Sequence, residues 1–153
     1  MIVKEFTGDR AKVKPLLLLA DSREAIEQYE RQGRIFVVMK AEEIVGVVLV
    51  LIDEESHAEL KNVAVAEKIQ GQGVGKLLVQ KVLSYLLQEG LNKVTVCTAN
   101  SSIGNLAFYQ KLGFRITGVR VGFFESYDPP VIEHGILGRD LIVLSYDPPL
   151  KTD

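Results

Sequence analysis

The chain has 153 residues, a length that suits one globular domain with a sizeable core, and 47% of them are hydrophobic and 25% charged. The formal net charge of −2 excludes the basic excess that nucleic-acid binding requires. A single cysteine rules out an internal disulfide, and the longest apolar run, residues 44–52, is too short to span a bilayer, so we expect a cytoplasmic protein that binds neither nucleic acid nor a membrane.

Periodicity and turn residues divide the first 66 residues into strands at 2–6, 34–40, 44–53 and 59–66 and helices at 11–19 and 21–32. Asp21 followed by Glu24 is a capping-box pattern for the second helix, and Gly33 is a typical helix stop. The continuous apolar run over 44–53 indicates a strand buried on both faces. The short connection before this run predicts an antiparallel pair with the preceding strand.

The best-defined helix of the chain follows a cluster of glycines. It is predicted by apolar residues four apart and ends at Gly90; the apolar positions are Val74, Leu78, Val82 and Leu86. Later elements are a strand at 93–98, a helix to residue 112 capped by Ser101 or Ser102, and strands at 115–124 and 141–146. This mixture, with antiparallel pairing early and a β-α-β crossover in the middle, predicts a single α+β domain over residues 1–153. Its central sheet would be mixed, mostly antiparallel, and flanked by helices.

The glycine cluster lies in residues 68–76, KIQGQGVGK. A P-loop needs G-x-x-x-x-G-K followed by Ser or Thr, but its first glycine position is Gln70 and Leu77 stands where the hydroxyl should be. A Rossmann fingerprint, G-x-G-x-x-G, fits the first two glycines, but its third position is Lys76. Both familiar phosphate motifs therefore fail.

The segment Gln70-Gly71-Gln72-Gly73-Val74-Gly75 matches the pattern Q/R-x-x-G-x-G/A, which resembles the acyl-CoA-binding signature of the GNAT acetyltransferases. Val63-Ala64-Val65 resembles the central strand of that family. Residues 105–114 resemble its late helix, which usually ends in Tyr-x-x-x-Gly-Phe. Residues 100–103, 109–111, 123–124 and 135–140 are also similar to a bacterial subgroup labelled aminoglycoside acetyltransferase-like. The resemblance implies a GNAT-like fold and direct transfer of an acetyl group from acetyl-CoA to a primary amine, without a metal.

The resemblance further implies that the coenzyme A pyrophosphate lies at a helix start, where N–H groups are unpaired and the helix dipole is positive. The cofactor-binding residues it implies are Val63, Ala64, Val65, Gln70, Gly71, Gln72, Gly73, Val74, Gly75, Lys76, Asn100, Ser102 and Asn105. The family's usual pantetheine-binding asparagine would fall at Ser102, so Asn100, Ser102 and Asn105 are alternatives for that contact. The competing interpretation of the glycines is close helix packing.

Two residues are expected to carry the chemistry. An alkylamine with a pKa near ~10.4 is mostly protonated at neutral pH and must lose a proton before it can attack. Glu59, at the start of the central strand, is the predicted general base; the alternative is a solvated strand-end carboxylate. Tyr109 is the predicted donor to the thiolate leaving group, with a core tyrosine as the alternative. Cys97 lies in an apolar strand and is expected to be a buried core residue.

The acceptor site is predicted at Phe124, Glu125 and Tyr127, because aromatic rings and a carboxylate suit a cationic amine. Hairpin packing explains Phe124 almost as well. A small-molecule amine is the expected acceptor. Two alternatives stay open, a protein N-terminal or lysine acetyltransferase and a non-catalytic acyl-CoA-binding or regulatory module. The sequence also leaves open a homodimer.

Overall fold

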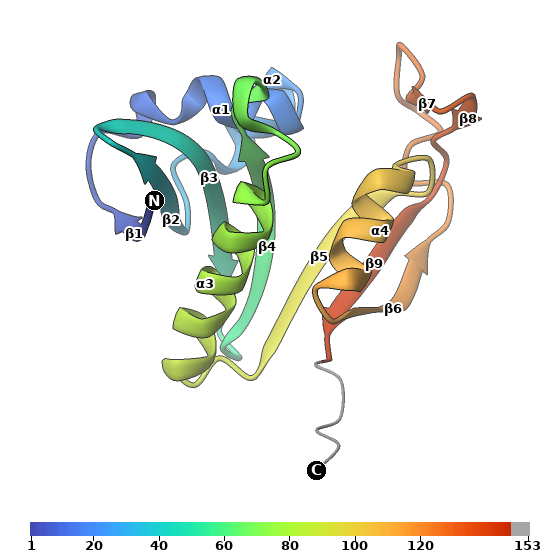
Figure 1. The fold of residues 1–153 in the computed structure, drawn as a ribbon. Coiled ribbons are helices and arrows are strands. Elements are labelled where there is room, and N and C mark those ends of the chain that lie inside the picture. Colours follow the sequence, from blue (N-terminus) through green and yellow to red (C-terminus); the bar gives the residue numbers. More distant parts are fainter. Residues whose placement is uncertain (148–153) are drawn as a thin grey trace. The chain divides into compact units, whose positions relative to one another are not determined.

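The computed structural model describes residues 1–147, which fall into two compact units, residues 1–92 and the residues from 93 onward (Figure 1). The strands of the first unit are β1 (Ile2–Phe6), β2 (Arg34–Lys40), β3 (Glu43–Ile52) and β4 (His57–Val65). Its helices are η1 (Arg10–Lys12), α1 (Lys14–Ala20), α2 (Arg23–Tyr29), η2 (Glu67–Ile69) and α3 (Val74–Gln88). The four strands pair in chain order, and every pair is antiparallel, as predicted for β2 and β3.

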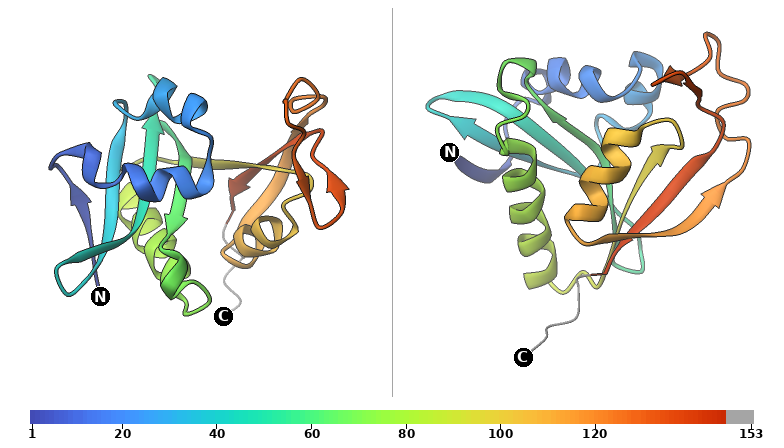
Figure 2. Two further views of the ribbon diagram at one scale, coloured as in Figure 1. Left: turned by 90° about the horizontal axis from the view of Figure 1, so that it is seen from above. Right: turned by 45° about the vertical axis from the view of Figure 1, so that its right-hand side comes forward.

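The sheet of the first unit is covered on both faces, with α1 and α2 on one side and α3 on the other (Figure 2). Because strand side chains alternate, Ile35 and Val37 of β2 join the core beneath α1 and α2, while the Phe36 ring stacks on Tyr85 of α3 at 6.0 Å between centroids. Residues 45 and 47–50 of β3 are fully buried. The prediction of a strand buried on both faces is confirmed.

The predicted limits of α2 are wrong at both ends. Its N-cap is Ser22, whose hydroxyl accepts the backbone N–H of Ala25, so the capping-box register at Asp21 is one residue early. The helix ends at Tyr29, before the predicted residue 32. The Arg10 guanidinium donates hydrogen bonds to the backbone carbonyls of residues 30, 32 and 33. These carbonyls therefore have a partner outside the helix.

The second unit holds a three-stranded antiparallel sheet in the order β5-β9-β6, with α4 packed against β6 and a small hairpin formed by β7 and β8. The bounds are β5 Lys93–Ala99, α4 Ile103–Lys111, β6 Phe114–Arg120, β7 Ile132–Glu133, β8 Ile136–Leu137 and β9 Leu141–Tyr146. No helix within residues 1–147 is long and apolar enough to cross a membrane.

Two predictions about secondary structure in the second unit are wrong. The strand predicted over 115–124 ends at Arg120, and residues 121–126 form turns. At Gly122 the backbone has φ 78°, and its N–H bonds to Asp140 in place of a strand partner. Ser102 occupies the N-cap position of α4 but does not cap it, because its hydroxyl donates to Glu133.

Candidate active site

The glycine turn of the first unit joins the end of β4 to α3 through η2. Gly71 and Gly73 have φ values of 80° and 81°, the left-handed region that favours glycine, and Gly73 is the N-cap of α3. Ile69 and Val74, both 4% exposed, anchor the turn in the core at either end. The side-chain amide of Gln70 donates to the carbonyl of Val65 at 2.9 Å. The turn therefore has a fixed shape although Gly71 and Gly73 are exposed.

The backbone N–H groups of this turn are available to a ligand. Within residues 1–147, none of the six consecutive N–H groups of residues 71–76 has a hydrogen-bond acceptor. A Cβ at Gly71 or Gly73 would have no other atom within 4 Å, so close helix packing is the wrong explanation for these two glycines. Lys76 is exposed on the first turn of α3, and Lys68 pairs with Glu43 at 2.7 Å. The arrangement is an open row of donors at the positive end of a 15-residue helix.

Glu59 lies half-buried in β4, third from its start. Leu60 and Asn62 are buried on the opposite side, as the predicted alternation requires. Leu49 of β3 pairs with Asn62, and the next residue, Val50, pairs with Leu60. Lys61 has no partner in this register and is the extra residue of a β-bulge.

A buried polar cluster that was not predicted from the sequence lies beside Glu59. The Asn62 amide donates to the Tyr29 hydroxyl and to the Leu17 carbonyl, and the Tyr29 hydroxyl donates to Asp21. Burial raises the pKa of Tyr29, and the nearby charges of Asp21 and Glu59 raise it further. Nothing local in the sequence indicates this cluster, because its members come from α1, α2, β4 and the connection between α1 and α2.

Tyr109 is the buried residue of α4, with 6% of its surface exposed. Its ring makes edge contacts with Phe108 and Phe114 at 5.1 and 5.5 Å between centroids. The hydroxyl has no hydrogen-bond partner among residues 1–147. Burial raises the pKa of Tyr109, so the phenol keeps its proton at neutral and mildly alkaline pH. A protonated hydroxyl of this kind can donate to an anion.

The three alternatives for the pantetheine contact differ in what their side chains already bind. Asn100 bonds to the Leu137 carbonyl and to the N–H groups of Arg139 and Asp140. Ser102 bonds to Glu133. Asn105 is exposed, and within residues 1–147 its side chain bonds only to Thr98, at 3.4 Å, a long hydrogen bond. Asn105 is therefore the one of the three whose side chain is largely available.

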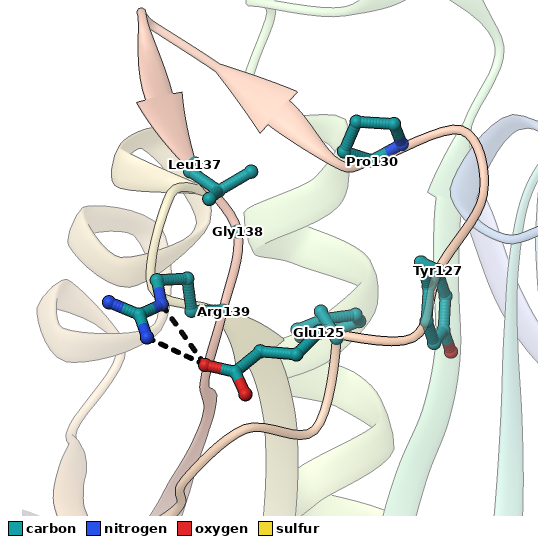
Figure 3. Close-up of a pocket in the computed structure, with 7 residues that line it drawn as sticks. Glu125, Tyr127, Pro130, Leu137, Gly138 and Arg139 are labelled. Carbon is teal, nitrogen blue, oxygen red and sulfur yellow. Dashed lines mark hydrogen bonds and ion pairs between the residues drawn. The ribbon is translucent and has the colours of Figure 1, made fainter.

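A pocket of about 310 Å³ lies within the second unit (Figure 3). Phe124, Glu125 and Tyr127 line it, as do Pro130 and residues 137–139. The structure thus brings together the three residues predicted to bind the acceptor.

Arg139, which no sequence pattern indicated as a binding residue, also lines this pocket. Its Nε and Nη2 atoms both donate to Oε1 of Glu125, at 3.1 and 2.7 Å, as the dashed lines in Figure 3 mark. The Glu125 carboxylate therefore already has a cationic partner. Its attraction for a second cation is weaker than the sequence alone indicated.

Two of the remaining candidate reactive groups are a cysteine and a histidine. Cys97 is half-buried in β5, not fully buried as expected. His57 lies near Asp53 and Glu55 at the start of β4. Within residues 1–147, His, Cys, Asp and Glu nowhere form a group of three that could hold a metal ion.

A glycine turn of this geometry at the start of a long helix, after the last strand of an antiparallel sheet, is characteristic of an acyl-CoA-dependent acetyltransferase fold. The model of the acetyltransferase (GNAT) family matches residues 4–114, and the chain belongs to this family. The predicted fold class is confirmed by solved structures of the family that superimpose on 95% of this chain with TM-scores of 0.85 to 0.88.

Three relatives illustrate the similarity. The uncharacterized N-acetyltransferase YvbK of Bacillus subtilis (strain 168) is 37% identical over 134 residues, which are 86% of each chain. A GNAT acetyltransferase from Elizabethkingia anophelis, solved with acetyl-CoA bound, is 38% identical, with a TM-score of 0.88 over 95% of this chain and 97% of that one. A Bacillus subtilis acetyltransferase solved in complex with CoA is 33% identical, with a TM-score of 0.87 and the same coverage. None of the three carries the aminoglycoside label of the predicted subgroup.

Proposed function

We propose that this chain is a cytoplasmic, acetyl-CoA-dependent N-acetyltransferase that acetylates a primary amine of a small molecule. The observation that carries the proposal is the row of six unpaired N–H groups at residues 71–76, at the start of the 15-residue helix α3. Two relatives of similar sequence hold acetyl-CoA or CoA in their solved structures, which supports the same co-substrate here.

In this proposal the N–H groups of the glycine turn bind the pyrophosphate of coenzyme A, and Lys76 adds positive charge. The absence of a side chain at Gly71 and Gly73 lets the phosphates approach the backbone. The backbone of residues 63–65 carries the pantetheine arm, and Asn105 provides the side-chain contact. Asn105 is preferred because Asn100 and Ser102 already bond within the protein.

The proposed reaction is a direct transfer. Glu59 takes a proton from the ammonium of the acceptor, directly or through water, and the neutral nitrogen attacks the thioester carbonyl carbon. The tetrahedral intermediate then breaks its carbon–sulfur bond, and the electron pair leaves with sulfur. The Tyr109 hydroxyl, kept protonated by its raised pKa, donates a proton to this thiolate. The nitrogen of the intermediate loses its second proton, which passes through solvent and restores the Tyr109 phenol. No metal is needed in any step.

The acceptor in this proposal binds in the pocket lined by Phe124, Glu125 and Tyr127. The Phe124 and Tyr127 rings lie 5.0 Å apart between centroids and offer aromatic faces and edges to the ligand. A volume of about 310 Å³ is near the lower limit for ligand pockets, which favours a small molecule over a peptide. Because Arg139 neutralises Glu125, the aromatic rings contribute most of the attraction for a cationic amine.

Free thiol release measures the proposed reaction directly. The protein and acetyl-CoA are incubated with one acceptor in each reaction. The acceptors are small primary amines, an aminoglycoside, and a peptide with a free N-terminus and a lysine. We expect thiol release with at least one small amine and acetylated amine in the same sample by mass spectrometry. Release with the peptide alone would favour a protein acetyltransferase. CoA binding without release from any acceptor would favour a non-catalytic module.

A further inference from the structure

The turn between β5 and α4 bonds to one later segment, residues 121–140, which we call the arm. Asn100 makes the most contacts. Its Oδ1 accepts the backbone N–H groups of Arg139 and Asp140 at 2.7 and 3.0 Å, and its Nδ2 donates to the carbonyl of Leu137 at 3.1 Å. The backbone N–H of Asn100 donates to the carbonyl of Asp140 at 3.0 Å. The Asn100 side chain therefore bonds to two backbone N–H groups and one backbone carbonyl within residues 137–140.

The next two residues of the turn hold the arm at a second point. The hydroxyls of Ser101 and Ser102 both donate to Oε1 of Glu133, at 3.1 and 2.7 Å. Ser101 is fully buried and Ser102 is 7% exposed, so these bonds form largely away from water. Hydrogen bonds to an ionised carboxylate are stronger than neutral ones, and partial burial strengthens them further.

The turn and the arm also touch where the arm lines the pocket. A Cβ built at Gly138 would lie 2.9 Å from Cγ1 of Val131 and 3.1 Å from Oγ of Ser101. A side chain would fit here only if Val131 or Ser101 moved away. Gly138 lies between Leu137 and Arg139, and all three residues line the pocket. The contacts of the turn therefore fix one wall of the pocket.

The opposite wall is tied to the same segment. The backbone N–H of Phe124 donates to the carbonyl of Arg139 at 3.0 Å, and Oδ1 of Asp140 accepts the N–H of Gly122 at 2.9 Å. The side chains of Glu125 and Arg139 form the ion pair described above. Displacement of residues 137–140 would therefore move both walls.

We infer that Asn100, Ser101, Ser102 and Glu133 are positioning residues for the acceptor pocket, which assigns Asn100 and Ser102 to the acceptor and not to coenzyme A. They hold the arm in the shape that binds the acceptor, so that binding does not have to order it. We call the hydrogen bonds from these residues to the arm the clamp. The kinetic test of the inference rests on the proposed acetyl transfer, whereas the clamp can be tested without activity.

The kinetic test compares Asn100→Ala with Asn100→Asp. Asn100→Ala removes three hydrogen bonds to the arm, and we expect the acceptor KM to rise about tenfold with the CoA dissociation constant unchanged. Asn100→Asp keeps an oxygen that accepts from Arg139 and Asp140, so it should recover most of the acceptor affinity. An unchanged KM in Asn100→Ala, or an equal loss of CoA affinity, would overturn the inference.

Gly138→Ala tests the clamp from the side of the arm. The added methyl must push Val131 or Ser101 away, and we expect the acceptor KM to rise while CoA binding holds. Gly104→Ala, in the first turn of α4, is the matched control, because a Cβ there has no atom within 4 Å. Equal KM values for the two variants would count against the clamp.

Hydrogen exchange separates failure of the clamp from failure of the proposed function. The amides of Arg139 and Asp140 should exchange faster in Asn100→Ala than in the wild-type protein, and Asn100→Asp should restore their protection. This result supports the clamp even if the wild-type protein acetylates no acceptor, in which case only the proposed function fails. Unchanged exchange in Asn100→Ala would show that the side chain does not hold the arm.

Discussion

The side-chain oxygen of Asn100 lies 2.7 Å from the backbone nitrogen of Arg139, 39 residues further along the chain. This hydrogen bond joins the turn before α4 to a residue that lines the pocket of the second unit. Asn100, one of three alternatives for the pantetheine contact that the family resemblance implied, therefore bonds within the protein. The predictions below likewise separate two roles. The glycine turn is expected to determine CoA affinity, and Tyr109 and Glu59 are expected to determine the reaction rate.

Tyr109→Phe should lower kcat by roughly 10²-fold, in the range of a lost acid–base contribution, with CoA affinity unchanged. The ring contacts with Phe108 and Phe114 survive the change, and the lost hydroxyl has no partner among residues 1–147. Thermal unfolding should therefore shift little. Tyr146→Phe is the control, since Tyr146 also packs on Phe114, and it should keep the wild-type kcat. Equal kcat values in both variants would leave Tyr109 as a packing residue only.

Glu59→Gln should slow the reaction at neutral pH and partly recover as the pH rises, because more of the amine then becomes neutral without help. The acidic limb of the kcat/KM profile should weaken in the variant. Glu54→Gln changes an exposed carboxylate in the turn before β4 and should leave the profile unaltered. If Glu59→Gln followed the wild-type profile from about pH 6 to 9 with chemistry rate-limiting, another group would be the base.

Tyr29→Phe should destabilise the protein by about 1–2 kcal/mol at neutral pH, because it removes the hydroxyl that joins Asp21 and Asn62. The Asn62 amide would keep its bond to the Leu17 carbonyl but lose one acceptor. Urea unfolding measures the difference. Tyr109→Phe, which removes a hydroxyl without such partners, serves as the comparison, and equal losses in the two variants would show that the cluster contributes nothing.

The same pair of tyrosines predicts how stability depends on alkaline pH. Burial raises the pKa of Tyr29 and of Tyr109 in the folded state above the value of about 10 in the unfolded chain. Above about pH 10 the unfolded state loses these protons first, so stability is fully present below that pH and falls above it, by up to about 1.4 kcal/mol per pH unit for each group. The stability deficit of Tyr29→Phe should therefore narrow above pH 10. A deficit that stays constant up to pH 11 would contradict the raised pKa.

Much of the fold could be predicted because the signals are local. The strands at 34–40 and 141–146 have the predicted bounds, since each is a short apolar run between clear turn residues. The glycine turn could be located from its density of glycines before a periodic helix and from its resemblance to the GNAT signature. Positive φ at Gly71 and Gly73 is a backbone requirement that only glycine meets readily.

The contacts around the pocket could not be predicted, because each joins residues far apart in the chain. A serine before a helix normally predicts a side-chain cap. Ser102 bonds instead to Glu133, 31 residues away, which leaves no trace in the local sequence. Arg139 and Asp140 are ordinary charged loop residues until the fold brings Asn100 against them.

The central claim is that the glycine turn binds the pyrophosphate of coenzyme A, and a calorimetric titration with CoA tests it most directly. The variant is Gly73→Val, which places a β-branched side chain among the free N–H groups. Gly90→Val is its matched control at the other end of α3. Gly90 also has a positive φ, 88° against 81°, and a Cβ at either position has no atom within 4 Å. Both variants should carry a similar backbone strain.

We predict that CoA binds to the wild-type protein and to folded Gly90→Val with similar affinity, and that folded Gly73→Val binds it at least about 100-fold more weakly, a loss of about 2.7 kcal/mol. Thermal unfolding of the two variants verifies that their stability costs match. Undiminished CoA binding by folded Gly73→Val would contradict the account, because the cofactor would then not depend on the backbone of this turn.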